Sequence, residues 1–335
     1  MSGAITLRVV GVVAETHDAV SLELVAESGQ RLPYRPGQFL TLRIPSAQTG
    51  SVARSYSLSS GPHEGGPLKV TVKRTEGGYG SNWLCDNAVV GMTIDSLSPA
   101  GIFTPDSLDA DLLLLAAGSG ITPVLSILKS ALAQGAGRCT LIYANRDENS
   151  VIFADELKSL TAAYPDRLVV LHWLESVQGL PSVRTVTALV APWTDREVFI
   201  CGPVPFMDAV VTATGDLGMD RTRVHVEKFV SLSGDPFAEV DDTGDAALVE
   251  VELDGTTTEF AWPRNTVLLD LLLARGVEAP YSCREGACSA CVCRVVDGEV
   301  KLLRNEVLER EDLADGYVLA CQAVPVTDTV RITYE

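Results

Sequence analysis

The chain has 335 residues, of which 46% are hydrophobic and 21% charged, so it is long enough for two or three domains with their own buried cores. A formal net charge of −18 argues against nucleic acid or an anionic membrane surface as a partner, because both attract basic proteins. Residues 1–10 lack a charged-then-apolar signal pattern, and no apolar run approaches the length of a membrane span. We therefore expect a cytoplasmic protein without a membrane span.

The first part of the chain, residues 1–107, predicts an antiparallel β-barrel. Apolar and polar residues alternate with a period of two in segments 5–13, 20–25, 39–44 and 68–73, and turns that contain glycine and proline separate these segments. Short strands joined by regular turns are typical of a small closed barrel.

Two segments of this barrel carry groups that suit a nucleotide. Residues 54–60 combine Arg54 and Tyr56 with four serines, which offers a guanidinium for phosphate, a flat ring for stacking and hydroxyls for a heteroaromatic edge. Residues 77–84 form a glycine loop at a possible helix start, where free backbone N–H groups can bind an anion. Taken alone, each segment is more typical of a surface strand or an ordinary turn.

Residues 108–230 predict a doubly wound α/β domain, because strand and helix patterns alternate there. The apolar run 111–117 is typical of a buried parallel strand, and it leads through a glycine turn, 118–123, into a helix. We expect Thr122 to cap this helix and Pro123 to be its first residue. A glycine turn before a helix N-terminus can hold a pyrophosphate, although this turn does not match the G-x-G-x-x-G pattern.

The ends of the predicted parallel strands indicate where a ligand of this domain would bind. Ligands of doubly wound domains lie at the carboxyl ends of the strands. Gly118, Asn145 and Cys201 each follow or end a predicted strand, so we expect the site beside them.

The last part of the chain predicts a linker and a third domain. Residues 231–245 are rich in Gly, Ser, Asp and Pro, which indicates an interdomain linker. Residues 246–335 then contain a hairpin around Asp254-Gly255 and a helix over 266–275, which indicates an α+β domain.

This domain contains five cysteines, and the spacing of four of them predicts a metal cluster. Cys283, Cys288 and Cys291 are spaced C-x4-C-x2-C, and with Cys321 they give the ligand spacing of a plant-type 2Fe-2S ferredoxin. Small residues around them let the loop wrap tightly, so that its backbone N–H groups can point at the sulfurs. Zinc is the alternative, but zinc sites usually pair two C-x2-C hooks, whereas the fourth cysteine here stands alone. Cys293 alternates with Cys291 along a strand, so we expect it to pack inside.

Five motifs occur here in the order found in the ferredoxin-NADP-reductase-like oxygenase reductases, and together they cover nearly the whole chain. They are Arg54-x-Tyr-Ser, Gly77-Gly-x-x-Ser81, Gly118-x-Gly-Ile-Thr-Pro123, Cys201-Gly-Pro203 and the ferredoxin cysteines. The resemblance implies a β-grasp-like fold for the C-terminal domain. Residues 226–229 and 298–306 are most similar to the reductase component of 3-ketosteroid-9α-hydroxylase, with the phenylacetyl-CoA epoxidase reductase subunit second.

The resemblance also implies a role for each motif. Tyr56 would stack on the flavin, Arg54 would pair with its phosphate, and Ser57 would hydrogen-bond near N5, the atom that takes the hydride. Cys201 would lie against the nicotinamide and help to place its C4, which makes Ser57 and Cys201 the catalytic candidates. Hydride transfer depends on such positioning rather than on an acid–base pair. The other implied cofactor contacts are Ser55, Val72, Lys73, Gly77, Gly78, Ser81 and Phe229 for FAD, and Gly118, Gly120, Thr122, Pro123, Gly202 and Pro203 for NADH.

The implied activity is electron transfer from NADH through FAD and a 2Fe-2S cluster to a terminal oxygenase of the Rieske type. The resemblance favours 3-ketosteroid 9α-monooxygenase in steroid degradation, and the alternatives are phenylacetyl-CoA epoxidase or another aromatic-ring oxygenase. A carrier that relays electrons without oxidising NADH itself is an alternative of another class. The residues alone do not decide between FAD and FMN. They also do not decide between NADH and NADPH, because Arg146 could reach a 2′-phosphate, whereas Asp147 and Glu148 would repel it.

Overall fold

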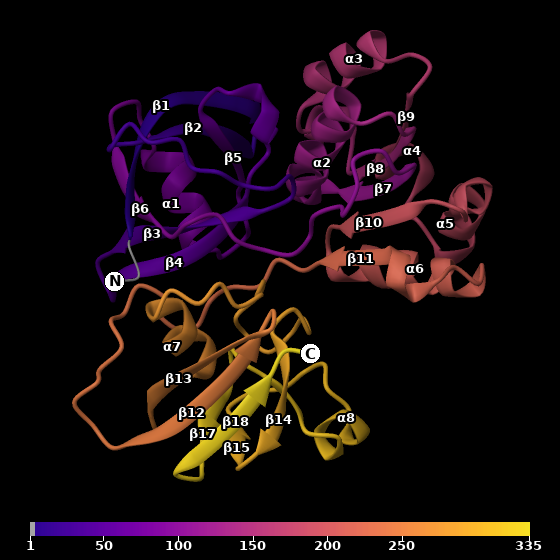
Figure 1. The fold of residues 1–335 in the computed structure, drawn as a ribbon. Coiled ribbons are helices and arrows are strands. Elements are labelled where there is room, and N and C mark those ends of the chain that lie inside the picture. The colour runs from indigo at the N-terminus through magenta and orange to yellow at the C-terminus, as the bar shows by residue number, and fades with distance from the viewer. Residues whose placement is uncertain (1–3) are drawn as a thin grey trace. The chain divides into compact units, whose positions relative to one another are not determined.

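A computed structural model describes residues 4–335 (Figure 1). The chain separates into two compact units. One unit contains Ile5–Pro99 and Phe103–Phe229, and the other contains Val230–Glu335 together with Ala100–Ile102. Among the described residues, no helix is long and apolar enough to cross a membrane.

An antiparallel barrel forms the first part of the larger unit. Its strands lie in the order β4-β3-β6-β1-β2-β5, and a bridge between Leu58 and Val70 joins the chain after β4 to β5, which closes the sheet. The alternating residues of the strands fill the interior, where Leu84 of the helix α1 is also fully buried. The elements are β1 (Ile5–Thr16), β2 (Ala19–Ala26), β3 (Phe39–Ser46), β4 (Gly50–Ser57), β5 (Leu68–Lys73), α1 (Tyr79–Asn87) and β6 (Thr93–Ser96).

A five-stranded parallel sheet forms the rest of this unit, in the order β11-β10-β7-β8-β9. Separate hydrophobic clusters cover its two faces, one with α2 and α3 and the other with α5 and α6, which confirms the doubly wound prediction. The elements are β7 (Leu112–Ala117), α2 (Ile121–Gln134), β8 (Cys139–Asn145), α3 (Ala154–Ala163), β9 (Leu168–Leu174), α4 (Glu175–Gln178), α5 (Val183–Val190), β10 (Glu197–Cys201), α6 (Val204–Asp216) and β11 (Val224–Glu227). The strand order reverses between β7 and β10, so the crevice for a ligand lies at their carboxyl ends.

The start of α2 differs from the prediction. A 3-10 turn, Gly118–Gly120, runs directly into the helix, which begins at Ile121. Thr122 lies inside the first turn, and its hydroxyl donates to the Ser119 carbonyl at 3.0 Å instead of capping the helix. The predicted cap at Thr122 and first residue at Pro123 are therefore wrong, because the 3-10 turn supplies the hydrogen bonds that a cap would otherwise make.

The smaller unit has a mixed sheet in the order β13-β12-β18-β14-β16. Strands β12 and β18 are parallel and the other neighbours antiparallel, while four of the five leucines of α7 are buried. This confirms the predicted α+β fold. The elements are β12 (Ala246–Leu253), β13 (Thr256–Pro263), α7 (Leu268–Ala274), β14 (Val292–Asp297), β15 (Val300–Leu302), α8 (Arg310–Ala314), β16 (Tyr317–Leu319), β17 (Ala323–Pro325) and β18 (Thr329–Thr333).

The segment 230–245 is attached to this smaller unit at several points. Leu232 is buried, Arg275 binds Asp242 at 2.6 Å, and Arg264 binds Asp245 at 2.8 Å. The stretch that the sequence predicts as a linker is thus fastened to the unit that follows it. The domain limits at 107/108, 230/231 and 245/246 stay predictions.

Candidate redox sites

Arg54, Tyr56 and the start of α1 lie together on the barrel. Arg54 and Tyr56 are two residues apart on β4. Because successive side chains of a strand point to opposite faces, these two lie on the same face. Gly80, in the first turn of α1, packs so closely that a Cβ there would lie 2.8 Å from Arg54 Cγ and 3.5 Å from Tyr56 Oη. Burial raises the pKa of the Tyr56 hydroxyl, which keeps the ring neutral. The structure thus places a cation, a neutral aromatic ring and a helix N-terminus side by side.

The glycine loop before α1 has the geometry of an anion site. Gly78 is the residue before the helix, and it has no side chain that could cap the N–H groups of the first turn. These N–H groups can therefore bind an anion. Ser81 lies in that turn, and its hydroxyl accepts from the Thr75 N–H at 3.1 Å, which fixes the loop. Gly77 adopts a φ of 67°, a left-handed value that suits glycine.

The other predicted flavin contacts differ in exposure. Ser57 is buried at the end of β4, and the Ser55 hydroxyl lies 3.1 Å from that of Thr41. Val72 is fully buried in the barrel core, and its carbonyl accepts a hydrogen bond from the Cys85 thiol at 3.7 Å. Phe229 follows β11 and is 51% exposed.

Lys73 connects the barrel to the glycine turn of the α/β domain. A Cβ on Gly118 would lie 3.6 Å from Lys73 Nζ. Burial lowers the pKa of Lys73, while the nearby Asp18 carboxylate, at 3.9 Å, opposes this shift. Lys73 therefore brings a cation to the turn where the sequence predicts a pyrophosphate.

Three predicted nicotinamide residues meet where the strand order reverses. Gly120 lies directly against Cys201 and Gly202, and a Cβ on Gly120 would collide with the Cys201 carbonyl. Any side chain at position 120 would push the glycine turn away from the end of β10. Thr122 and Pro123 are buried in the first turn of α2, and Pro203 precedes α6.

Glu227 is a buried carboxylate beside Cys201 that the sequence reasoning missed. The two residues end neighbouring parallel strands in register. Burial, and secondly the Glu227 charge, raise the pKa of the Cys201 thiol well above its ordinary value, so the thiol stays protonated. An acidic residue that ends an apolar strand, as Glu227 ends β11, is the signal that could have identified it.

Asn145 lies at the edge of the sheet where the sequence predicts the ligand site, but the sequence does not show the state of its side chain. It is the last residue of β8 and is only 7% exposed, and its amide nitrogen and oxygen make no well-formed hydrogen bond among the described residues, although the Tyr143 hydroxyl lies close to the amide. The nearby Tyr143 hydroxyl donates to the Gly118 carbonyl at 3.1 Å instead. A buried amide without well-formed hydrogen bonds is costly, so a ligand that pairs with Asn145 would relieve that cost.

Arg146 is paired with Asp18, while 55% of its side chain stays exposed. Its guanidinium lies 2.6 Å from the Asp18 carboxylate. Burial alone would raise the pKa of Asp18, but the hydrogen bond from Thr16 and the charges of Lys73 and Arg146 outweigh it and lower the pKa. Asp18 is therefore ionised and compensates the charge of Arg146.

The four cysteines of the ferredoxin spacing gather in two pairs. Side-chain interactions join Cys283 to Cys288 and Cys291 to Cys321. The Cys288 side chain, and then N–H groups of the loop, lower the pKa of Cys283, while the Cys283 side chain and burial raise the pKa of Cys288. Among the described residues, no three His, Cys, Asp or Glu side chains surround one metal position. Two pairs of cysteine side chains suit a 2Fe-2S cluster, which four cysteines would hold as thiolates.

The backbone of the cysteine loop points at these sulfurs. The N–H groups of Glu285 and Ala287 both donate to Cys283 Sγ at 3.4 Å, and the Cys283 N–H donates to Cys288 Sγ at 3.3 Å. Such bonds stabilise thiolates, so this loop fits an iron-sulfur cluster. Cys293 is buried within β14, as expected.

Comparisons with known proteins agree with this arrangement. Three family models match successive parts of the chain: "Oxidoreductase FAD-binding domain" at residues 6–104, "Oxidoreductase NAD-binding domain" at 114–212 and "2Fe-2S iron-sulfur cluster binding domain" at 251–326. The chain is 56% identical to the ferredoxin reductase component of 3-ketosteroid-9-alpha-monooxygenase from Rhodococcus rhodochrous, over 99% of this chain and 97% of the relative. The chain belongs to the oxygenase reductase family. The reductase is thus an oxidoreductase with FAD-binding, NAD-binding and 2Fe-2S domains, as predicted.

Further relatives place the reductase within this family. It is 57% identical to the corresponding component from Mycobacterium tuberculosis strain H37Rv, over 98% of this chain and 95% of the relative. It is 34% identical to a 1,2-phenylacetyl-CoA epoxidase subunit from Escherichia coli K12, over 98% of this chain and 97% of the relative. The crystal structure of phthalate dioxygenase reductase matches with a TM-score of 0.61 at 25% identity, over 99% of this chain and 98% of that one.

Proposed function

We propose that the reductase delivers electrons from NADH to the oxygenase of a 3-ketosteroid 9α-monooxygenase system. The observation that carries this proposal is the identity of 56–57%, over nearly the whole chain, to reductase components of 3-ketosteroid-9-alpha-monooxygenase. The epoxidase subunit is far less similar, at 34%. We place the reductase in the cytoplasm and expect a Rieske-type oxygenase as its partner, with the acidic surface of the chain as the docking face.

The flavin residues would hold FAD at the barrel. Bound FAD accepts two electrons as a hydride and releases them one at a time. Arg54 and the N–H groups after Gly78 bind its phosphates, Ser81 fixes their loop, and the neutral Tyr56 ring packs against its ring system. Ser57 offers a hydroxyl at the end of β4. The remaining FAD contacts that we propose are Ser55, Val72, Lys73, Gly77 and Phe229.

The nicotinamide residues would hold NADH at the ends of β7 and β10. The turn at Gly118 and Gly120 binds the pyrophosphate with the help of Lys73. The half-buried Gly202 would face the nicotinamide with the fully buried Cys201 behind it, and the protonated thiol adds no charge there. Thr122, Pro123 and Pro203 shape the rest of the site. The Asn145 amide supplies a hydrogen bond to NADH.

NADH rather than NADPH is favoured by the state of Arg146. A 2′-phosphate would need a free guanidinium, but Asp18 binds Arg146 and adds a negative charge beside it. The extra carboxylates of Asp147 and Glu148 follow Arg146 directly.

The four paired cysteines, Cys283, Cys288, Cys291 and Cys321, would hold the 2Fe-2S cluster, and the loop N–H groups would stabilise their thiolates. A cluster of this kind accepts and donates one electron at a time.

The decisive experiment mixes the purified reductase and NADH with candidate oxygenases and their substrates. We expect product from a 3-ketosteroid 9α-oxygenase at a rate far above that with the oxygenase of a phenylacetyl-CoA epoxidase. Equal support of both, or support of the epoxidase alone, would overturn the steroid assignment. An anaerobic NADH titration tests the enzyme itself: if NADH does not bleach the flavin, the protein is a carrier rather than a reductase.

A further inference from the structure

Glu285 is a buried carboxylate within the cysteine loop. It lies two residues after Cys283 and is only 4% exposed. A carboxylate in such a position remains charged only if other groups pair with it and donate hydrogen bonds. The groups that bind the Glu285 carboxylate therefore help to hold the cysteine loop in place.

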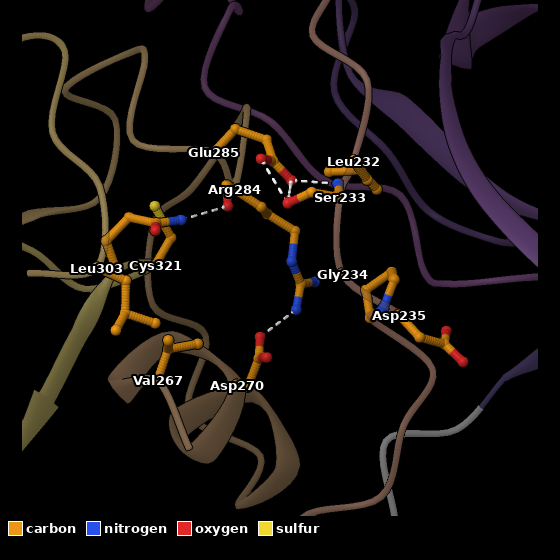
Figure 2. A pocket seen from close by; sticks show the side chains of 12 residues that line it. Leu232, Ser233, Gly234, Asp235, Val267, Asp270, Arg284, Glu285, Leu303 and Cys321 are labelled. Carbon is orange, nitrogen blue, oxygen red and sulfur yellow. Dashed lines mark hydrogen bonds and ion pairs between the residues drawn. The ribbon is translucent and has the colours of Figure 1, made fainter. Parts of the chain in front are cut away.

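The partners of Glu285 come from outside the loop (Figure 2). The Ser233 N–H donates to Oε1 at 2.6 Å, and the Ser233 hydroxyl lies 3.0 Å from Oε1 and 2.8 Å from Oε2. The Arg304 guanidinium also lies 3.4 Å from Oε2. Ser233 belongs to the segment 231–245, so the predicted linker is hydrogen-bonded to the cysteine loop itself.

The same residue reaches a cluster ligand through its backbone. The Glu285 N–H donates to Cys283 Sγ at 3.4 Å. Glu285 therefore binds Ser233 through its side chain and a cluster ligand through its backbone. The loop is also fixed beside Glu285, because the Gln322 side chain donates to the Arg284 carbonyl at 2.9 Å and the Glu306 N–H donates to the Gly286 carbonyl at 3.0 Å. Gln322 follows Cys321, and Glu306 ends the 298–306 motif. A shift of Glu285 would therefore be felt at the sulfur.

Two physical effects connect this contact to the redox properties of the cluster. Hydrogen bonds to the sulfurs and nearby charges set the reduction potential of an iron-sulfur cluster. A negative charge disfavours addition of an electron, and the donors of Ser233 and Arg304 partly offset the charge of Glu285. Loss of the Ser233 hydroxyl would expose more of that charge and loosen the bond to Cys283, and both changes lower the reduction potential.

We propose that Ser233 and Glu285 are positioning residues through which the segment 231–245 sets the reduction potential of the 2Fe-2S cluster. This inference rests on the proposed cluster at Cys283, Cys288, Cys291 and Cys321. Attachment of the segment to its own domain would thus do more than hold the chain in place, since it tunes the group that delivers electrons.

The test is a potentiometric titration of the purified holoprotein, with the reduced cluster followed by electron paramagnetic resonance. Ser233→Ala should lower the potential by an amount equal to a several-fold change in the electron-transfer equilibrium constant, where tenfold corresponds to about 59 mV for one electron. Glu285→Gln should raise it, because the charge is lost while an acceptor oxygen remains. Ser231→Ala is the matched control, since Ser231 is an exposed serine of the same segment, and its potential should equal that of the wild type.

The outcomes separate the possible failures. A Ser233→Ala protein with a full cluster and an unchanged potential would overturn the inference, as would a Ser231→Ala shift of the same size. In the Ser233→Ala/Glu285→Gln double variant, the effect of the serine should shrink, because the charge through which it acts is gone. If Glu285→Gln does not assemble a cluster, the potentials of Ser233→Ala and Ser231→Ala alone test the inference. Wild-type protein without iron and acid-labile sulfide would instead contradict the proposed function.

Discussion

Cys201 and Glu227 end the adjacent parallel strands β10 and β11 in register, so a thiol and a carboxylate lie buried side by side where the nicotinamide is proposed to bind. The carboxylate cannot activate the thiol as a nucleophile, because a neighbouring negative charge and burial both favour the protonated form. The pair is therefore suited to positioning a ring rather than to covalent chemistry.

Cys201→Ala should slow flavin reduction by NADH. Loss of the sulfur leaves space beneath the nicotinamide, and misplacement of this kind can cost about 100-fold in rate. The measurement is the rate of flavin bleaching by anaerobic stopped flow at saturating NADH. Cys139→Ala is the control, because Cys139 is also buried in this sheet but begins β8, at the opposite end from the site. Equal rates for the two variants would remove Cys201 from the site.

The rate of flavin reduction should show no thiol titration between about pH 6 and pH 9. The ordinary pKa of a cysteine is 9.0, and burial with the Glu227 charge raises that of Cys201 well above it, so the thiol stays neutral throughout this range. The pH profile of the stopped-flow rate checks this. A step in the wild type that disappears in Cys201→Ala would show that the thiolate forms.

Asn145→Leu should weaken NADH binding without loss of folding stability. Removal of the two amide atoms, which lack well-formed hydrogen bonds, relieves a buried polar cost, so the melting temperature should stay equal or rise. Loss of a hydrogen bond to NADH, worth about 1 kcal/mol, should raise the dissociation constant roughly fivefold to tenfold. The two readouts are the melting curve without NADH and a binding titration. Lower stability with unchanged binding would make Asn145 a structural residue.

Asp18→Asn should improve the use of NADPH. The change removes a negative charge and frees Arg146 for a 2′-phosphate, so the dissociation constant for NADPH should fall about threefold to tenfold while that for NADH changes little. Asp86→Asn, which breaks a comparable pair with Arg74 elsewhere on the barrel, serves as the control. The preference for NADH has another origin if both variants bind NADPH like the wild type.

Cys288→Ser should separate the two halves of the electron path. The variant should keep NADH-dependent reduction of a dye by the flavin, but lose the iron signal and delivery to an oxygenase. Cys293→Ala should keep both activities, because Cys293 belongs to neither cysteine pair. Loss of dye reduction in Cys288→Ser would contradict a path that reaches the flavin first.

The sequence predicts local features of this reductase well and long-range contacts poorly. Strand alternation in the barrel, the buried strand β7 and the spacing of the cysteines depend on neighbouring residues, so their patterns are visible in the chain. The contact between Ser233 and Glu285 joins residues 52 positions apart, and the pairing of Cys201 with Glu227 depends on strand register. Neither follows from composition or periodicity.

The start of α2 shows the same limit on a smaller scale. Thr122 has the residue type of a cap, but the packing of Gly120 against Cys201 extends the turn into the helix before Thr122. A tertiary contact therefore overrides a local preference.

The fastened segment shortens the free chain between β11 and the smaller unit. Fifteen residues, 231–245, could span about 50 Å if they were free and extended, at about 3.5 Å per residue. With Leu232 buried and Ser233, Asp242 and Asp245 held, the part that remains before the first anchor is 228–231, which spans about 14 Å at most. A short tether keeps the cluster at a high effective concentration relative to the rest of its own molecule, so electron transfer within the reductase should not depend on protein concentration.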